Sequence, residues 1–451
     1  MFRKYAEHYF RLSFHGTTVR TELVAGATTF VTMAYILFVN PAVLATDFAG
    51  NPTGLDPQAV FLATALSTAF ASALMGFYAN LPIAQAPGMG NNYLFVSVVM
   101  AVGALGYAQP WRIALGCVFW SGVLFLALSL ARARKAIIDA LSPSLRSGIS
   151  VGIGLFITFI GLRNAGVIEG KPGTLLGLNT DLDFRALLVF AVGLLTMVVA
   201  HVRRWPGSIL AGIGASAALA LGLGLTQAPA RWFGWPEIRE PAAFRFDLAG
   251  SLSLQFLPFI LMLAFTDMFD TVGTLVGVTE RAGLARNGEI PNANRALISD
   301  AAGTVVGAAL GTSTVTTYIE SAAGVEQGGR TGLMVVFTAA CFLLSIAAAP
   351  AVEVFAGHPA VTAPALIFVG LFMSLEIRRI RWDDLSESLP AFLTLLLIPL
   401  LFSIADGIAI GMIAYAVVKV ASGRARDVRW PMWVAVVLLA VFLATVRARL
   451  G

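Results

Sequence analysis

The amino-acid sequence predicts an all-α polytopic membrane protein with fourteen transmembrane segments, arranged as two inverted repeats of seven spans. The first observation is composition, because 58% of the 451 residues are hydrophobic and 12% are charged, whereas soluble domains carry about 25% charged residues. The second is that apolar stretches recur from one end of the chain to the other. The third is that two short spans, seven spans apart, each follow a segment of non-helical character.

The apolar segments predict fourteen spans, several of them shorter than the roughly 20 residues that cross a bilayer upright. In chain order they are Leu23–Ala45, Ala59–Tyr78, Asn92–Gly106, Ile113–Leu130, Ile149–Leu162, Ala186–Ala200, Ser208–Leu225, Phe256–Val278, Ala296–Leu310, Tyr318–Gln327, Leu333–Ala349, Val361–Leu375, Pro390–Ser403 and Ala405–Ala421. A further apolar segment, Trp430–Val446, is expected either to cross the membrane or to lie along its surface as a tail helix.

Basic residues predict the orientation, because Lys and Arg concentrate in cytoplasmic loops. Clusters occur before the first span and otherwise only after even-numbered spans: Arg3, Lys4, Arg11 and Arg20; Arg132, Arg134 and Lys135; Arg203 and Arg204; Arg281, Arg286 and Arg295; Arg330; Arg378, Arg379 and Arg381; Lys419, Arg424, Arg426 and Arg429. The main exceptions are Arg231, Arg239 and Arg245. We therefore expect a multi-pass protein of the cytoplasmic (inner) membrane with a cytoplasmic N-terminus, whose first span serves as its signal anchor.

The two short spans predict the position of a binding site. "LPIAQAPGMGNN" (Leu81–Asn92) precedes one of them, and the β-branched "GTSTVTTY" (Gly311–Tyr318) precedes the other. Irregular backbone at membrane depth must be buried or line a cavity, and two short strands can pair and satisfy each other's backbone groups. Seven is an odd number, so the second repeat must lie upside down. Interrupted segments at matching places in inverted repeats indicate a transport site near the bilayer midplane.

Acidic side chains inside spans are the main candidates for function, because each costs roughly 2.5–3.5 kcal/mol to insert. Asp267 and Asp270 are spaced i, i+3 on one face of a helix, with Thr274 one turn further on. Glu320 lies in the first turn of the tenth span, where the helix dipole favours a negative charge. A purely structural role, in which the acids only hold helices together, is a weaker interpretation than a functional role for three acids near broken segments.

Other residue types point away from enzymes and metal sites. Asp300, Asp406 and Glu22 lie near predicted span ends, so a capping or snorkelling role is expected for them. The four histidines lie near span ends or in loops, and both cysteines lie in apolar runs, which favours simple packing. The sequence has no HExxH motif. We expect no metal and no cofactor, and the net charge of +5 is explained by cytoplasmic loops rather than by nucleic acid.

Buried carboxyl groups favour proton coupling, because desolvation and a neighbouring like charge both favour the protonated form. One proton moving through 100 mV releases about 2.3 kcal/mol, enough for roughly fiftyfold accumulation of a neutral solute. A carboxylate accepts two parallel N–H bonds, so planar heterocycles with adjacent N–H and C=O groups are suitable ligands.

Four segments in order carry a family resemblance: "TFVTMAYILFVNPAVL" (Thr29–Leu44), "APGMGNN" (Ala86–Asn92), "DMFDTVGTLVGV" (Asp267–Val278) and "GTSTVTTYIESAAGVEQGGRTG" (Gly311–Gly332). The chain resembles the nucleobase–ascorbate transporter superfamily (nucleobase:cation symporter-2), and within it the azaguanine-resistance-type guanine/hypoxanthine/adenine permeases. The resemblance implies proton-coupled purine uptake by alternating access. It also implies a homodimer through gate-domain surfaces.

The resemblance further implies that a core domain and a gate domain alternate along the chain. The predicted parts are the core at 1–135, the gate at 136–250, the core again at 251–350, the gate again at 351–422, and an apolar tail helix at 423–451. Alternating access then comes from one domain moving against the other.

The resemblance also implies the binding residues. Asp270 and Glu320 are the substrate-binding acids, Asp267 is a candidate for the proton relay with them, and the expected neighbours are Thr274, Tyr318, Ser321, Asn92, Tyr93 and Phe30. Thr274 stands where uracil-type relatives carry a more polar or ionisable residue, which favours a purine.

One departure from the family pattern concerns the half-helix of the third span. The purine branch usually reads "APGMGLNAY", whereas this chain reads "APGMGNNYLF", with Asn91 and Tyr93 in place of an apolar and a small residue. Tyr93 would shrink the cavity or stack on the substrate, or it would face the lipid and matter little. The alternatives are a xanthine- or uracil-type permease and an anion transporter of the same fold, which the acids disfavour by repulsion. An integral-membrane enzyme ranks last.

Overall fold

The computed structural model of the protein describes residues 2–48, 50–131, 142–170, 176–284 and 290–445. Some residues used for the topology prediction lie outside these ranges, namely Arg132, Arg134, Lys135, Arg286 and Val446. The α-helices among the described residues are α1 (Phe2–Phe10), α2 (Val19–Met33), α3 (Ile36–Leu44), α4 (Pro57–Leu74), α5 (Met89–Ala104), α6 (Pro110–Leu130), α8 (Pro143–Asn164), α9 (Phe184–Val202), α10 (Ser208–Gly222), α11 (Leu248–Ser251), α12 (Leu257–Arg281), α13 (Ala293–Leu310), α14 (Ser321–Glu326), α15 (Gly332–Leu344), α16 (Val352–Ala356), α17 (Pro359–Ser374), α18 (Leu385–Leu400), α19 (Ile404–Ala421) and α20 (Trp430–Thr445).

Every predicted span coincides with a helix, which confirms the helical membrane fold. In the described part of the chain, eight helical segments are long and apolar enough to cross a membrane: α2 with α3, α4 with the π-helical turn η1 (Met75–Ala79), α6, α8, α9, α12, α17 with the 3₁₀ turn η4 (Leu375–Arg379), and α19. The remaining predicted spans coincide with α5, α10, α13, α14, α15 and α18. The sequence analysis did not predict α1, α11, α16 or the hairpin of β2 (Ile168–Glu169) and β3 (Gly177–Leu178).

The two strands predicted before the half-helices are present and pair with each other. β1 (Gln85–Pro87) and β4 (Val315–Thr317) run antiparallel, with Gln85 opposite Thr317 and Pro87 opposite Val315. The backbone N–H of Tyr318 donates to the Ala84 carbonyl at 2.9 Å, which extends the ladder by one further bond. All six strand residues are buried, so the pairing satisfies backbone groups that water cannot reach.

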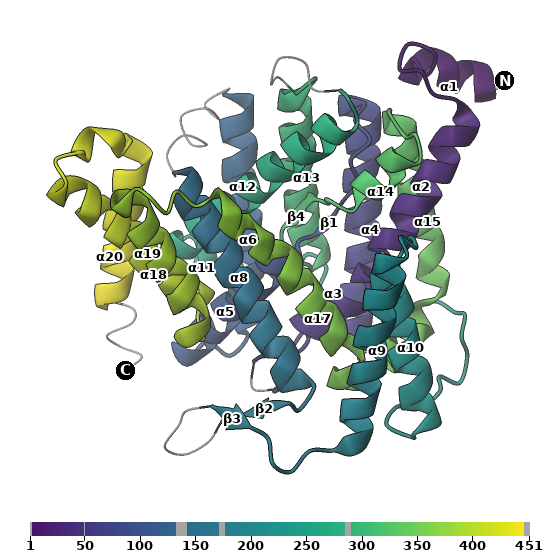
Figure 1. Cartoon of the computed structure of the whole chain (residues 1–451), viewed down its shortest axis with the longest axis horizontal. Helices are drawn as coiled ribbons and strands as arrows, with labels where there is room; N and C mark the ends of the chain where they lie inside the picture. Colours follow the sequence, from purple (N-terminus) through teal and green to yellow (C-terminus); the bar gives the residue numbers. More distant parts are fainter. Residues whose placement is uncertain (1, 49, 132–141, 171–175, 285–289, 446–451) are drawn as a thin grey trace.

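Local sequence explains where β4 begins. Helix α13 ends at Gly311, which has a φ of 104°, a left-handed conformation that glycine adopts without steric cost. The β-branched residues that follow favour an extended backbone. The chain therefore leaves α13, forms β4 at membrane depth and starts α14 at Ser321 (Figure 1).

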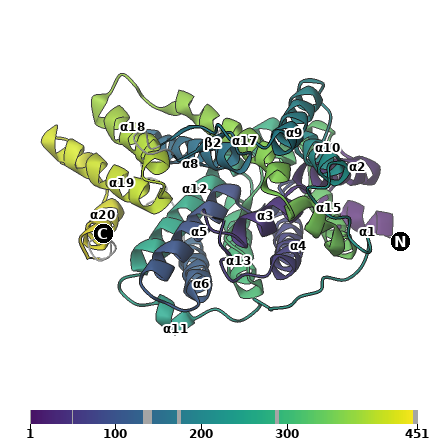
Figure 2. The same ribbon diagram turned by 90° about the horizontal axis from the view of Figure 1, so that it is seen from below.

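The helices form two bundles that lie side by side (Figure 2). The first bundle consists of α2–α6 and α12–α15 with β1 and β4, in which α13 packs on α4 and α6 and α15 packs on α2 and α4. The second bundle consists of α8–α10 and α17–α19, in which α8 packs on α17 and α18 and α9 packs on α10. Glycine permits the closest approach: a Cβ on Gly154 of α8 would lie 2.8 Å from the carbonyl oxygen of Gly370 of α17, as in small-residue contacts of membrane helices.

Candidate functional site

The antiparallel pairing of β1 and β4 places two half-helices back to back. Helix α5 starts at Met89, directly after β1, and α14 starts at Ser321, directly after β4. Figure 1 shows both strands near the middle of the molecule, between α4 and α13. Side chains immediately after each strand therefore meet at the centre, as the paired broken segments predicted.

Glu320 is held at this centre by the break in the first span. The chain leaves the regular helix between α2 and α3, at Ala34 and Tyr35. The buried Tyr35 hydroxyl donates to Oε1 of Glu320 at 2.8 Å, and the Thr32 hydroxyl donates to the Glu320 carbonyl at 3.4 Å. Sequence reasoning missed Tyr35, although a tyrosine in the middle of an apolar span was a visible signal.

Asp270 lies on α12, within electrostatic range of Glu320. Its side chain is exposed, whereas Asp267 and Thr274 on the same helix are buried. The predicted pair of acids is therefore brought together at one place, with Asp270 on an accessible face of α12.

Asp267 turns away from this accessible face and is fixed behind β4. The Thr304 hydroxyl donates to Oδ2 of Asp267 at 2.9 Å and lies 2.9 Å from the carbonyl oxygen of Val315, whose N–H donates to it at 3.1 Å. One threonine of α13 thus links the acid to both backbone groups of a strand residue. In the described structure the second oxygen of Asp267 is buried without a hydrogen-bond partner.

Asp300 corrects an expectation, because a span-end role for it is wrong. Helix α13 begins at Ala293, so Asp300 lies well inside the helix and is fully buried. It accepts hydrogen bonds from the side-chain amide of Gln85 at 2.8 Å and from the Thr271 hydroxyl at 2.7 Å. The Thr271 and Thr316 hydroxyls lie 2.9 Å apart. Asp300 therefore connects β1, β4 and α12, which is a role that only the three-dimensional contacts reveal.

Three further predicted site residues connect the strands and half-helices. The Tyr318 hydroxyl donates to the carbonyl oxygen of Pro87, and the Ser321 hydroxyl accepts from the N–H of Ala84 at 3.0 Å. The Asn92 side chain accepts from the Ser313 hydroxyl. Each of these contacts joins the segment of β1 and α5 to the segment of β4 and α14.

The arrangement of broken helices, paired strands and central acids matches a known family. The model of the Permease family matches residues 20–410. The chain belongs to this family, that of the nucleobase–ascorbate transporters. It is a membrane permease and not an enzyme.

Curated relatives cover nearly the whole permease. It is 42% identical to adenine permease AdeQ of Escherichia coli (strain K12), over 96% of this chain and 94% of that protein. It is 40% identical to guanine/hypoxanthine permease PbuG of Bacillus subtilis (strain 168), over 96% of this chain and 99% of that protein. Putative permease MJ0326 of Methanocaldococcus jannaschii is 44% identical over 98% of both chains.

Solved structures share the permease's fold at low sequence identity. The transmembrane domain of the cyanobacterial bicarbonate transporter BicA has a TM-score of 0.66 at 17% identity and covers 86% of this chain and 96% of that chain. The SLC26A9 structure has a TM-score of 0.65 at 12% identity, over 90% of this chain and 66% of that chain. These likenesses establish the fold and leave the ligand open.

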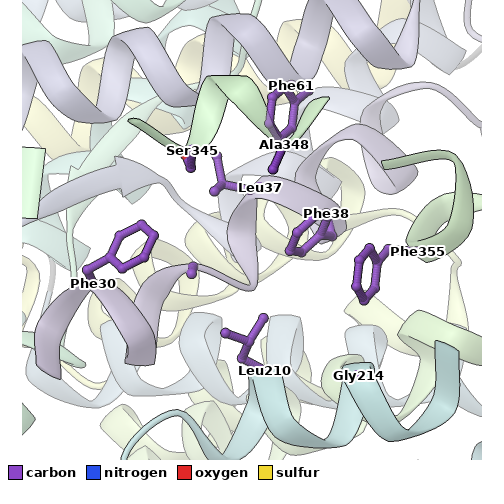
Figure 3. Close-up of a pocket in the computed structure, with 10 residues that line it drawn as sticks. Phe30, Leu37, Phe38, Phe61, Leu210, Gly214, Ser345, Ala348 and Phe355 are labelled. Atoms are coloured by element: carbon purple, nitrogen blue, oxygen red, sulfur yellow. The ribbon is translucent and has the colours of Figure 1, made fainter. Parts of the chain in front are cut away.

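Phe30 and Tyr93, the remaining predicted contacts, lie in apolar surroundings. Phe30 lines an open apolar cleft of about 370 Å³ between the first span and α10, together with Leu37, Leu210 and Phe355 (Figure 3). Tyr93 is buried and packs beside Phe48 and Phe156. It therefore faces neither lipid nor open water.

Acids outside the centre act mainly on helix ends. Glu22 is buried and accepts hydrogen bonds from the N–H groups of Arg330, Thr331 and Met334 at 2.8, 3.3 and 3.1 Å, so it caps α15 as the sequence predicted. Asp406 lies in the first turn of α19, and its N–H donates to Ser403 at 3.2 Å. Among the described residues, no group of three or more His, Cys, Asp or Glu side chains could hold a metal ion.

Lys419 differs from the expected marker of a cytoplasmic loop. It is fully buried at the end of α19 and forms an ion pair with the buried Glu387 at 2.7 Å. At the surface beside this pair, Arg424 donates to Asp384 at 2.9 Å, and this contact, together with Ser386, holds the pKa of the Asp384 carboxyl well below its ordinary value.

Proposed function

We propose that this permease takes up purine nucleobases of the guanine/hypoxanthine/adenine class, coupled to protons, by alternating access. The observation that carries the proposal is that Glu320, shortly after β4, and Asp270 of α12 lie within electrostatic range of each other beside the paired strands β1 and β4. The curated names of its relatives, which include adenine and guanine/hypoxanthine permeases, support a purine as the substrate. We place the N-terminus in the cytoplasm, as the basic residues predict.

The chemistry of the two acids suits a purine. A carboxylate accepts two parallel N–H bonds in a planar geometry, and the edge of a purine presents adjacent N–H and acceptor atoms. Glu320 accepts the Tyr35 hydroxyl at Oε1, and we assign its second oxygen to the ligand. Thr274, buried one turn beyond Asp270, adds a hydroxyl that both donates and accepts.

Proton coupling follows from the lack of compensating charge. In the described part of the chain, no lysine or arginine forms a salt bridge with Asp270 or Glu320. Two neighbouring carboxylates repel each other, so a proton on one of them stabilises the pair. We assign the transported proton to Asp270 and Glu320, and Asp267 to a supporting relay position behind β4.

Alternating access is assigned to relative movement of the two bundles. We propose that 1–135 and 251–350 form the moving core domain and that 136–250 and 351–422 form the gate domain. The acids lie on the first bundle, and α8 and α17 of the second bundle pack closely on each other, so each bundle can move as a unit.

Uptake of radiolabelled hypoxanthine, adenine and guanine into cells tests the proposal. Glu320→Gln and Asp270→Asn are expected to abolish saturable uptake, because each keeps the side-chain shape and removes the charge. Glu353→Gln, a change at an exposed acid of α16, serves as the matched control. Normal hypoxanthine uptake by a correctly folded Glu320→Gln protein would contradict the site assignment, and a competition panel of unlabelled nucleobases defines which base binds.

A further inference from the structure

Four aromatic side chains from separate elements form one cluster at the boundary between the two bundles. This aromatic cluster consists of Phe48, Tyr93, Phe156 and Phe402. The ring centroids of Phe48 lie 5.1 Å from Phe156 and 5.6 Å from Phe402, and Phe156 lies 5.3 Å from Phe402, all in edge-to-face geometry. Phe48 and Tyr93 stack at 6.2 Å. Such distances and angles are favourable for aromatic pairs.

The cluster joins the bundles to each other. Phe48 follows α3 and Tyr93 lies in the first turns of α5, so both belong to the first bundle. Phe156 is on α8 and Phe402 follows α18, so both belong to the second bundle. Each edge-to-face pair of Phe48 must therefore break if the bundles separate here.

Arg163 contacts both bundles at the same boundary, beside the aromatic rings. Its guanidinium donates to the carbonyl oxygen of Phe48 and lies 5.9 Å from the centre of the Phe402 ring, within the range of a cation–π contact. Arg163 is at the exposed end of α8. One side chain thus ties the first bundle's loop to an aromatic ring of the second.

Phe402 holds an unfavourable backbone conformation. Its φ is 54°, in the left-handed region that is rare for bulky residues and easy for glycine. A glycine would end α18 at this position without strain. A phenylalanine here indicates that the ring itself is required, since strained positions concentrate where function needs them.

The cluster lies on one side of the candidate site. The hairpin β2–β3, which follows Arg163, lies at the face opposite the N-terminus (Figure 1). Within the cluster Phe48, Tyr93 and Phe156 are buried, while Asp270 remains exposed. The cluster, which Arg163 contacts at this end of α8, is therefore buried toward the face opposite the N-terminus.

We propose that the aromatic cluster and Arg163 form the gate that closes the binding site toward the face opposite the N-terminus. This inference rests on the proposed alternating access. It assigns a role to Tyr93, one of the two residues at which the chain departs from the family pattern: its ring, on the half-helix α5, fills space in the gate. Opening the gate separates Phe48 and Tyr93 from Phe156 and Phe402.

Accessibility of a single cysteine tests the gate without any substrate. The native Cys117 and Cys341 are replaced by alanine, and Asp270→Cys supplies the reporter in every protein compared. An impermeant methanethiosulfonate reagent is added from either face of membrane vesicles, whose orientation is set by cleavage of an N-terminal tag. From the face opposite the N-terminus, Arg163→Gln and Phe402→Gly are expected to accelerate labelling by about tenfold, because each weakens the closed state selectively.

Two controls define the outcome. Phe119→Leu removes an edge-to-face contact with Trp120, the next residue of α6 in the first bundle, and it is expected to leave labelling unchanged. Labelling from the N-terminal face is expected to be fast in all proteins. Unaltered rates in both gate variants, or fast labelling of the reference protein from the face opposite the N-terminus, would overturn the gate. Absence of purine uptake by the protein with its native Asp270, together with the expected labelling pattern in the reporter proteins, would instead reject the proposed substrate and keep the gate.

Discussion

Replacement of Asp300 by asparagine or alanine distinguishes a hydrogen-bonding role from a charge role. The two oxygens of Asp300 accept from Gln85 at 2.8 Å and from Thr271 at 2.7 Å. In Asp300→Asn the amide oxygen can still accept from Gln85. The new amide group can donate to the Thr271 hydroxyl, which can turn and donate to Thr316, 2.9 Å away.

The magnitudes follow from this difference. Asp300→Asn keeps every partner satisfied, so the expected cost is about 0–1 kcal/mol. In Asp300→Ala the Thr271 hydroxyl can still turn to Thr316, but the buried amide of Gln85 loses its acceptor at about 1–3 kcal/mol. The small cavity adds to this, for a total of roughly 2–4 kcal/mol. Such a loss is a large part of the roughly 5–15 kcal/mol that stabilises a typical domain.

The stability is measured by thermal unfolding in detergent, which is monitored by fluorescence size-exclusion chromatography. The function is measured by purine uptake into cells. We expect Asp300→Asn to unfold within a few degrees of the wild type and to retain uptake, while Asp300→Ala yields little folded protein. Equal destabilisation by both variants would refute the reasoning from hydrogen-bond geometry. A stable Asp300→Asn protein without uptake would instead show that the charge of Asp300 takes part in transport.

Three other predictions follow from the contacts. Tyr35→Phe removes the donor to Glu320 and keeps the ring. Uptake kinetics are expected to show about tenfold lower transport efficiency, because a hydrogen bond to a charged group contributes about 1.5–3 kcal/mol. Tyr9→Phe, at an exposed hydroxyl that donates to Phe77, is the control. Glu22→Ala removes the acceptor for three N–H groups at the start of α15. It is expected to destabilise the protein by about 1–3 kcal/mol, which is measured as a lower unfolding temperature. Glu353→Ala, the control, is expected to leave the unfolding temperature unchanged. Lys419→Met removes the buried partner of Glu387, which keeps its ion pair with Arg381 at 3.1 Å, so the expected cost is about 1–3 kcal/mol. The double variant Lys419→Met, Glu387→Leu is expected to restore much of the loss. A double variant as unstable as the single one would contradict the ion-pair argument.

Much of the fold could be predicted because membrane insertion restricts the choices. Apolar runs must be helical when water is absent, so each predicted span coincides with a helix. The β-branched run before Glu320 and the proline- and glycine-containing run before Asn92 were predicted to be non-helical segments that can pair, and they do pair as β1 and β4. Short surface elements such as α1 and the β2–β3 hairpin were missed, because neither is marked by an apolar run.

The candidate site was predictable only in part. Asp270 and Glu320 were visible as charges in apolar surroundings, and they lie within electrostatic range of each other in the structure. Tyr35, Gln85 and Thr271 were missed, since uncharged polar residues inside spans are common and their partners lie far away in the sequence. Asp300 was misplaced because the predicted ninth span began three residues too late, and this put the acid nearer to a helix end than it is.

By itself, the sequence determined that this chain crosses a membrane many times, that two spans are interrupted, and that acids accompany the interruptions. Hydropathy and local backbone preference suffice for these statements, because they depend on neighbouring residues alone. The tertiary structure decided which acids face an open surface and which are fixed behind the strands. That distinction depends on helix rotation and on contacts between residues more than two hundred positions apart, such as Tyr35 with Glu320 and Gln85 with Asp300, and no local pattern encodes it.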